Sequence, residues 1–218
     1  PDERARLRAE LDGLVAHLYG LTEEEFAYIL TTFPLVEQSV KEAALAAYRY
    51  FAPKPLDKRV EALIAAGESA TVEFKSSARW DRKENRANKA LEQVIVKTIA
   101  AFLNGEGGTL LIGVGDDKKP MGLADDYKTL GKRQDRDGYE NWLTTLLLGS
   151  LGKEMSPLIR IEFCELGGCD ICVVDTSPSS KPTYIKETNA ENLYIRTGNS
   201  TRLLTSREAV EYVKQHWR

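Results

Sequence analysis

The chain has 218 residues, of which 42% are hydrophobic and 29% are charged, and its formal net charge is −3. This composition is typical of a globular protein with a core, and the near-neutral charge argues against binding to nucleic acid by bulk electrostatics alone. The sequence shows no signal peptide and no apolar run approaching the ~20 residues of a membrane span. Because it also has only three cysteines, we expect a cytoplasmic protein without a membrane partner.

Apolar side chains recur at helical spacing over residues 1–52, which predicts a helical N-terminal extension. A capping box at Thr22–Glu25 starts a second helix, which Pro34 interrupts, and a third helix is expected from about residue 36 to residue 51. The segment Ala52-Pro53-Lys54-Pro55 cannot continue a helix and is the linker candidate. The first helix carries one apolar stripe, which consists of Leu7, Leu11, Leu14, Val15 and Leu18.

Residues 57–218 alternate between helix and strand patterns and predict an α/β domain, with a mixed sheet flanked by helices. A helix over 57–66 leads into a strand over 70–75. A strongly periodic helix follows and ends at Asn104-Gly105, and the apolar run Thr109–Val114 predicts a strand buried on both faces. Because the order is strand, helix, strand, we expect the two strands to be neighbours in one sheet.

The rest of this domain gives weaker signals. A helix is expected over 139–151, and the runs 159–163 and 170–175, separated by Gly167-Gly168, predict a β-hairpin. A strand over 192–197 precedes a polar loop over 198–202. The last helix begins at a second capping box, Thr205–Glu208.

Four acidic residues adjoin the first two predicted strands: Glu68, Glu73, Asp116 and Asp117. Carboxylate oxygens are the ligands that Mg²⁺ and Mn²⁺ prefer, and such a cluster can activate water to cleave a phosphodiester. Each residue also has a structural explanation, because Glu68 can end a helix, Glu73 can pair with a nearby cation, and the two aspartates can form a turn. The spacing alone leaves both interpretations open.

Positive charge is concentrated between positions 75 and 97, where seven basic residues stand against three acidic ones. Such a stretch fits either a solvated surface or a surface that binds phosphates. The polar loop around Arg196 and Arg202 suits phosphate contacts, or forms an ordinary strand-to-helix turn. The sequence has no phosphate-loop motif and no Ser-His-Asp signature, and Cys169-x-x-Cys172 lacks a second pair to complete a zinc site.

Several motifs, in order along residues 57–218, resemble the AlbA-type domain of the Schlafen family. They are Glu-Ser-x-x-Val-Glu-Phe-Lys at 68–75, Ala-Ala-Phe-Leu-Asn at 100–104, the glycine-flanked strand 107–116, and Tyr-Ile-Arg-Thr-Gly-Asn-Ser-Thr-Arg at 194–202. The resemblance implies a domain that binds RNA or DNA. Relatives that are nucleases use three catalytic carboxylates, which fall here on Glu68, Glu73 and Asp116.

The resemblance also implies a metal cofactor and a set of residues that contact phosphates. The three carboxylates would hold Mg²⁺ or Mn²⁺, with Asp117 as the alternative to Asp116 because Gly115 stands where relatives often have another acid. Phosphates would be contacted by Lys75, Arg79, Arg196 and Arg202. The duplicated core of the mammalian nucleases is absent, so an RNA groove of that type would require a homodimer.

The segment Leu18–Phe26 is similar to the C-terminal tail of bacterial restriction-associated adenine methyltransferases. The chain has no Asn-Pro-Pro-Tyr motif, so this similarity implies no methylation but a piece of a larger phage-defence or DNA-modification protein. Three hypotheses remain open: a metal-dependent nuclease acting on RNA or DNA, a non-catalytic nucleic-acid-binding module, and a protein-interaction module whose helical N-terminus docks a partner subunit.

Overall fold

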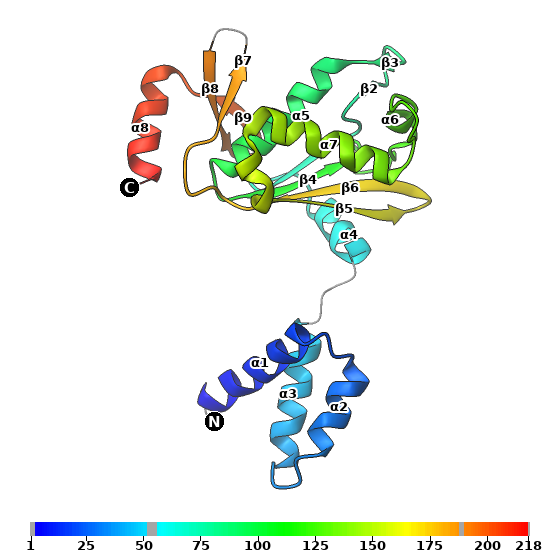
Figure 1. The fold of residues 1–218 in the computed structure, drawn as a ribbon, viewed down its shortest axis with the longest axis vertical. Coiled ribbons are helices and arrows are strands. Elements are labelled where there is room, and N and C mark those ends of the chain that lie inside the picture. Colours follow the sequence, from blue (N-terminus) through cyan, green and yellow to red (C-terminus); the bar gives the residue numbers. More distant parts are fainter. Residues whose placement is uncertain (1–2, 52–55, 188–189, 218) are drawn as a thin grey trace. The chain divides into compact units, whose positions relative to one another are not determined.

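The computed structural model describes residues 3–51, 56–187 and 190–217. The chain divides into two compact units, residues 1–55 and 56–218 (Figure 1). The linker predicted over 52–55 lies outside the described residues. None of the helices within the described ranges is both long enough and apolar enough to cross a membrane.

Three helices form the N-terminal unit: α1 (Glu3–Leu18), α2 (Glu23–Thr31) and α3 (Gln38–Phe51). Helix α1 packs against α3 through its small residues Ala9, Gly13 and Ala16, which are buried. A Cβ atom on Gly13 would lie only 2.6 Å from the backbone nitrogen of Tyr48, so the two helix backbones approach very closely there. The helical extension predicted from the sequence is confirmed.

The apolar stripe of α1 takes no part in this packing. A stripe of this kind normally faces a core, yet Leu7, Leu11, Leu14 and Leu18 remain 51, 60, 43 and 85% exposed. With 3.6 residues per turn, these leucines lie on the side of the helix opposite the small residues that contact α3. The stripe is therefore an apolar face without a partner among the described residues of this unit.

Helix α2 begins at the predicted capping box. The Glu25 backbone N–H donates to Thr22 Oγ1 at 3.2 Å, and the Thr22 backbone N–H donates to Glu25 Oε2 at 2.8 Å. Two first-turn N–H groups of the kind that helices leave unpaired are thus satisfied, and the prediction is confirmed.

A four-stranded sheet, in the order β1-β4-β6-β5, forms the centre of the second unit (Figure 1). Strands β1 and β4 pair in parallel, with Val72 opposite Thr109, and the remaining pairs are antiparallel. The sheet is therefore mixed and the first two predicted strands are neighbours, as expected. Its strands are β1 (Val72–Lys75), β4 (Gly108–Ile112), β5 (Ile159–Leu166) and β6 (Cys169–Thr176).

Helices cover both faces of this sheet. Along β4, Leu111 packs with residues of α4, whereas Leu110 and Ile112 pack with residues of α5 and α7. Successive strand residues point to opposite faces, so a strand covered on both sides must be apolar throughout. The covering helices are α4 (Leu56–Ala66), α5 (Lys89–Leu103) and α7 (Arg136–Leu151).

A second, three-stranded sheet consists of β7 (Tyr184–Glu187), β8 (Ala190–Thr197) and β9 (Ser200–Leu203). The loop predicted over 198–202 is wrong, because Gly198 and Asn199 form a tight turn and Thr197 pairs with Ser200 in an antiparallel hairpin. Gly198 has a φ of +59°, a conformation that favours glycine and allows the tight turn. The polar composition of this segment did not distinguish a hairpin turn from a loop. Helix α8 (Ser206–His216) follows and starts at the predicted capping box, Thr205–Glu208.

Several short elements, including β7, were not expected from the sequence. A small hairpin consists of β2 (Trp80–Asp81) and β3 (Arg86–Ala87), and helix α6 spans Ala124–Lys128. A 3₁₀ helix over Lys153–Leu158 joins α7 to β5. Elements of two to six residues are too short to show a hydrophobic period, so only the folded chain reveals them.

Candidate functional site

Glu68 lies along the free edge of β1, which is the end strand of the central sheet. Its Oε1 atom accepts a hydrogen bond from the Phe74 backbone N–H at 2.9 Å, and the neighbouring Ser69 N–H donates to the Val72 carbonyl at 2.9 Å. The segment before β1 therefore satisfies backbone groups of that strand that no other strand reaches. This position gives Glu68 a structural role.

Glu73 points to the opposite face of the sheet from α4, because its neighbours Val72 and Phe74 pack with α4. The residue is only 8% exposed. Its Oε2 atom accepts from Arg196 Nη1 at 2.8 Å, and its Oε1 atom accepts from the Lys75 ammonium group. Both oxygens of this carboxylate are thus occupied by cations of the protein itself.

Arg196 reaches Glu73 from strand β8, 123 residues along the chain. Its side chain is 5% exposed. The guanidinium also donates to the carbonyls of Ser69 at 2.7 Å and Ala70 at 3.3 Å, and lies 5.2 Å from the centre of the Phe102 ring. Arg196 therefore holds the small sheet against the start of β1, and its donors are not available to a phosphate.

Asp116 and Asp117 lie in the exposed turn that follows β4. Asp117 pairs with Lys119 at 3.0 Å, and the hydrogen bond from that lysine lowers the pKa of the Asp117 carboxyl. The turn is closed by the Lys118 N–H, which donates to the Gly115 carbonyl at 2.9 Å. These aspartates match the turn interpretation of the sequence.

The three carboxylates predicted to bind a metal occupy different places around the sheet. Glu68 is at the edge of β1, Glu73 is on a buried face, and Asp116 is in a solvent-exposed turn. Across the part of the chain that the structure describes, no three His, Cys, Asp or Glu side chains are grouped so that they could hold a metal ion. The described residues therefore give no support to a shared site for Mg²⁺ or Mn²⁺, which need several oxygen ligands around one point, and the metal site stays a prediction.

We expect Arg196→Ala to destabilise residues 56–218 by about 2–3 kcal/mol, since it leaves Glu73 buried with Lys75 as its remaining cation. Chemical denaturation followed by circular dichroism measures this change. Arg202→Ala is the matched control on the neighbouring strand, because Arg202 is 62% exposed and should change stability by less than about 0.5 kcal/mol. Equal stabilities for the two variants would contradict the anchoring role of Arg196.

The basic stretch of the sequence becomes the β2–β3 hairpin and the segments next to it. A buried carboxylate, Asp126 of α6, holds the base of this hairpin. Its oxygens accept from the backbone N–H groups of Ala78 at 3.0 Å, Arg79 at 3.1 Å and Trp80 at 2.9 Å, and from the Ser77 hydroxyl. The buried Tyr139 hydroxyl donates to the same carboxylate at 3.3 Å, and burial raises the pKa of this tyrosine well above its usual value.

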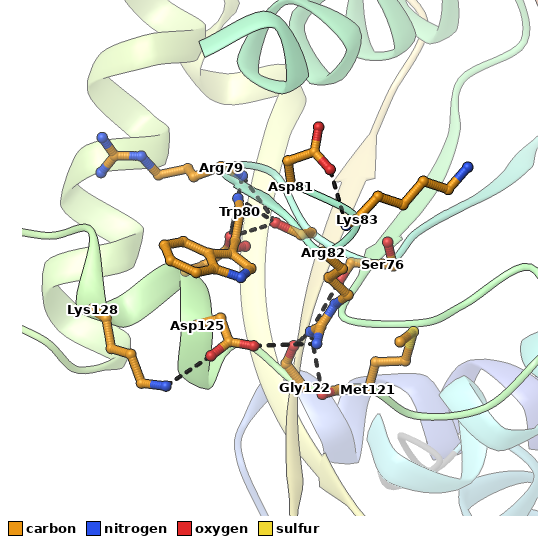
Figure 2. Close-up of polar contacts among 12 residues, drawn as sticks. Ser76, Arg79, Trp80, Asp81, Arg82, Lys83, Met121, Gly122, Asp125 and Lys128 are labelled. Carbon is orange, nitrogen blue, oxygen red and sulfur yellow. Dashed lines mark hydrogen bonds and ion pairs between the residues drawn. The ribbon is translucent and has the colours of Figure 1, made fainter. Parts of the chain in front are cut away.

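Arg82 fixes the hairpin a second time, as Figure 2 shows. Its guanidinium donates to the Gly122 carbonyl at 3.0 Å and to Asp125 Oδ2 at 3.2 Å. Lys128 donates to the other oxygen of Asp125 at 2.8 Å, and this hydrogen bond lowers the pKa of the Asp125 carboxyl. Arg82 thus ties the hairpin both to α6, through Asp125, and to the segment before α6, through Gly122.

The predicted phosphate ligands differ in how accessible they are. Arg79 is mostly buried, pairs with Glu92 at 3.1 Å and stacks on the Trp142 ring at 4.7 Å. Lys75 is held by Glu73, whereas Arg202 is exposed. Of the four, Lys75 and Arg196 therefore meet at the Glu73 carboxylate, whereas Arg79 is held by Glu92 and Arg202 is exposed.

Other basic residues of this segment are exposed. They are Lys83 and Arg86 of the hairpin and Lys89 at the start of α5, whereas Trp80 of β2 is half-buried. Asp81 stabilises the turn by accepting from the backbone N–H groups of Lys83 at 3.0 Å and of Glu84 at 3.1 Å. The charge excess between positions 75 and 97 was the sequence signal for this surface, whereas nothing in the local sequence marked Asp126.

The second unit is an α/β domain with a mixed sheet, helices on both faces and an anchored basic hairpin. A solved structure with the same fold is the DIP2311 protein from Corynebacterium diphtheriae, with a TM-score of 0.50 and 17% sequence identity over 75% of this chain and 32% of that one. The match thus spans about a third of the DIP2311 chain, and at this identity the likeness concerns the fold alone. No curated protein matches the chain.

Residues 68–205, well over half of the chain, match the family described as Schlafen, AlbA_2. The chain belongs to this family. The match begins after the N-terminal unit, so the similarity of that unit to methyltransferase tails stays a prediction.

Proposed function

We propose that the AlbA_2 domain binds nucleic acid through the hairpin surface, which we define as Trp80, Lys83, Arg86 and Lys89. One observation carries the proposal: Trp80, Lys83 and Arg86 lie on a hairpin whose base is fixed by hydrogen bonds to the buried Asp126, and Lys89 begins the helix α5 that follows directly. A surface that is already ordered loses little conformational entropy when it binds. Family membership is consistent with such a role.

The positive charge of this surface comes from a short segment of the chain. The segment from Arg79 to Lys89 contains five basic and two acidic residues, although the whole chain carries a net charge of −3. Two of the basic residues, Arg79 and Arg82, are held inside the domain by Glu92 and Asp125, which leaves the three at the turn and beyond it for phosphates. Binding of these three residues to phosphates would release counterions from the nucleic acid, so the affinity would fall as the salt concentration rises.

Trp80 adds a face on which a base could stack. Aromatic rings combined with basic side chains are usual in proteins that bind single strands, where stacking contributes about 1–3 kcal/mol per base. Trp80 pairs with Ala87 and Asp81 pairs with Arg86, so the Trp80 ring lies on the other face of the hairpin from the Arg86 side chain. The Trp80 backbone N–H is held by Asp126, so the ring projects from a fixed point. This favours single-stranded RNA or DNA over a duplex as the ligand.

The proposal does not include metal-dependent cleavage. The carboxylates that the family resemblance assigns to catalysis are occupied in structural contacts, as described above for Glu68 and Glu73. Asp116 offers a clean test, since it is exposed and its replacement should not disturb the fold. Products that form with Mn²⁺ and disappear in Asp116→Asn would favour the nuclease hypothesis instead.

Reversal of the three charges of the hairpin surface should weaken binding. We expect Lys83→Glu/Arg86→Glu/Lys89→Glu to lower the affinity for single-stranded RNA or DNA by about 10–100-fold, and to reduce the slope of log affinity against log salt by roughly two. Fluorescence anisotropy with labelled oligonucleotides, over a series of salt concentrations and with EDTA present, measures both quantities.

The control carries the same change in net charge elsewhere in the domain. Lys153→Glu/Lys186→Glu/Lys214→Glu also replaces three exposed basic residues, in the 3₁₀ helix, β7 and α8. An equal loss of affinity in both triple variants would mean that only net charge matters. Unchanged binding in the hairpin variant would rule out this surface.

A further inference from the structure

We propose that α1 pairs with the α1 helix of a second copy of this chain through its exposed leucine face, made of Leu7, Leu11, Leu14 and Leu18. This inference is independent of the proposed nucleic-acid binding, because it concerns only the N-terminal unit (Figure 1). The two sides of α1 differ in burial, because its small residues are buried against α3 and its leucines are exposed.

Helix α1 has two apolar sides with different chemistry. The side made of Ala9, Gly13 and Ala16 is buried, and at Gly13 it leaves no room for even one methyl group against α3. The opposite side carries the larger leucines, which are between 43 and 85% exposed. Large apolar side chains normally provide the burial that stabilises a small unit, so a whole row of them in solvent indicates that something covers it.

The spacing of the leucines indicates what the partner is. They follow one another at intervals of four, three and four residues, which is the pattern of core positions in a two-helix coiled coil. Such a row fits into the matching row of another helix, whereas a globular pocket would require no regular interval. The N-terminal unit itself offers no such helix, because α3 occupies the small-residue side of α1.

A second copy supplies the required helix, and its charges fit. In heptad terms Leu7 and Leu14 occupy one core position, Leu11 and Leu18 the other, and Glu3 and Arg8 flank the core on opposite sides. In a parallel pair, Glu3 of each copy lies opposite Arg8 of the other, which gives two symmetric ion pairs. The four leucines and the flanking charges are thus self-complementary, whereas Arg4, at the core position before Leu7, would face its own copy at the end of the pair.

The size of the face sets the expected strength. One leucine side chain offers roughly 100 Å² of apolar surface, so the four partly exposed leucines offer only a few hundred Å² per copy. This falls below the roughly 800 Å² per partner of a stable interface. The pair should therefore be weak, with a dissociation constant on the order of tens of micromolar.

Analytical ultracentrifugation of the full chain, from about 1 to about 200 µM, tests the proposal across the expected range of dissociation constants. We expect the wild-type chain to shift from monomer to dimer as its concentration rises. Leu11→Glu/Leu14→Glu should raise the dissociation constant at least tenfold while circular dichroism stays unchanged, because both leucines are exposed in the monomer. Wild-type chains that stay monomeric throughout would overturn the proposal.

The matched control places the same charges on other exposed apolar residues of the unit. Tyr28→Glu/Leu35→Glu changes residues that are 71 and 98% exposed and lie outside α1, so it should leave the dissociation constant unchanged. Arg8→Glu should weaken the dimer, and Glu3→Arg/Arg8→Glu should restore it. Equal weakening by the control, or no restoration by the double charge swap, would contradict this pairing of helices.

Discussion

Asp126→Ala is expected to destabilise residues 56–218 by about 3–5 kcal/mol and to lower their melting temperature by roughly 10 °C. The carboxylate is buried and accepts from three successive backbone N–H groups, from the Ser77 hydroxyl and from the Tyr139 hydroxyl. Without it, the Ala78 N–H and the hydroxyls of Ser77 and Tyr139 would remain in the interior unpaired, and each such group costs about 1–3 kcal/mol before the site relaxes. The Arg79 and Trp80 N–H groups would keep the Ser77 hydroxyl oxygen as an acceptor, at 3.1 and 2.7 Å. The hairpin would also lose its fixed base, so nucleic-acid binding should weaken in parallel.

Two variants separate the loss of this acceptor from a general effect of mutation. Asp126→Asn keeps the shape and one acceptor oxygen, so its melting temperature should fall between those of the wild-type and alanine chains. Asp125→Ala, one residue away, removes ion pairs that are partly exposed and should cost no more than about 1 kcal/mol. Differential scanning calorimetry gives all the values. An Asp126→Ala chain as stable as Asp125→Ala would contradict the anchoring role.

Asn104→Asp should cost about 3–4 kcal/mol, although the two side chains have the same shape. The Asn104 amide is fully buried at the end of α5, and its Nδ2 group donates to the carbonyls of Thr183 at 2.8 Å and Tyr194 at 3.0 Å. Its Oδ1 atom accepts from the Thr183 N–H at 2.8 Å. Aspartate would retain the acceptor but place a second, charged oxygen against two carbonyls.

Denaturation in urea measures this difference, with the exposed Asn199→Asp as the matched control. The control should change the free energy of unfolding by less than about 0.5 kcal/mol. The destabilisation of Asn104→Asp should also be smaller at pH values low enough to protonate the new carboxyl, since a neutral acid can donate to one carbonyl. A full loss at every pH would point to steric rather than polar causes.

Elements whose pattern lies within a short stretch of the chain could be predicted from the sequence. The α5 helix, the apolar β4 strand and both capping boxes depend on neighbours a few residues apart, and all are present. That β1 and β4 are neighbours also followed from the strand-helix-strand order, and the structure shows that they pair in parallel. These features are local or follow from chain connectivity, so a single sequence contains the information.

The candidate site could be predicted only in part, because its contacts join distant parts of the chain. Glu73 meets Arg196 from 123 residues away, and Asp126 meets the turn around Ala78 from 48 residues away. The spacing of acidic residues placed Glu68, Glu73 and Asp116 near two neighbouring strands. It could not reveal that they lie at an edge, on a face and in a turn, because this depends on which groups each one pairs with after folding.

The contact between Glu68 and Phe74 has a consequence for self-association. An end strand with free N–H and C=O groups can recruit a strand from another molecule and start aggregation. Here the segment ahead of β1 occupies those groups, through the Glu68 carboxylate and the Ser69 N–H. Glu68 therefore protects this edge from pairing with a strand of another molecule, and a variant without its carboxylate should aggregate more readily. A loss of activity in such a variant would not by itself show that Glu68 takes part in a reaction.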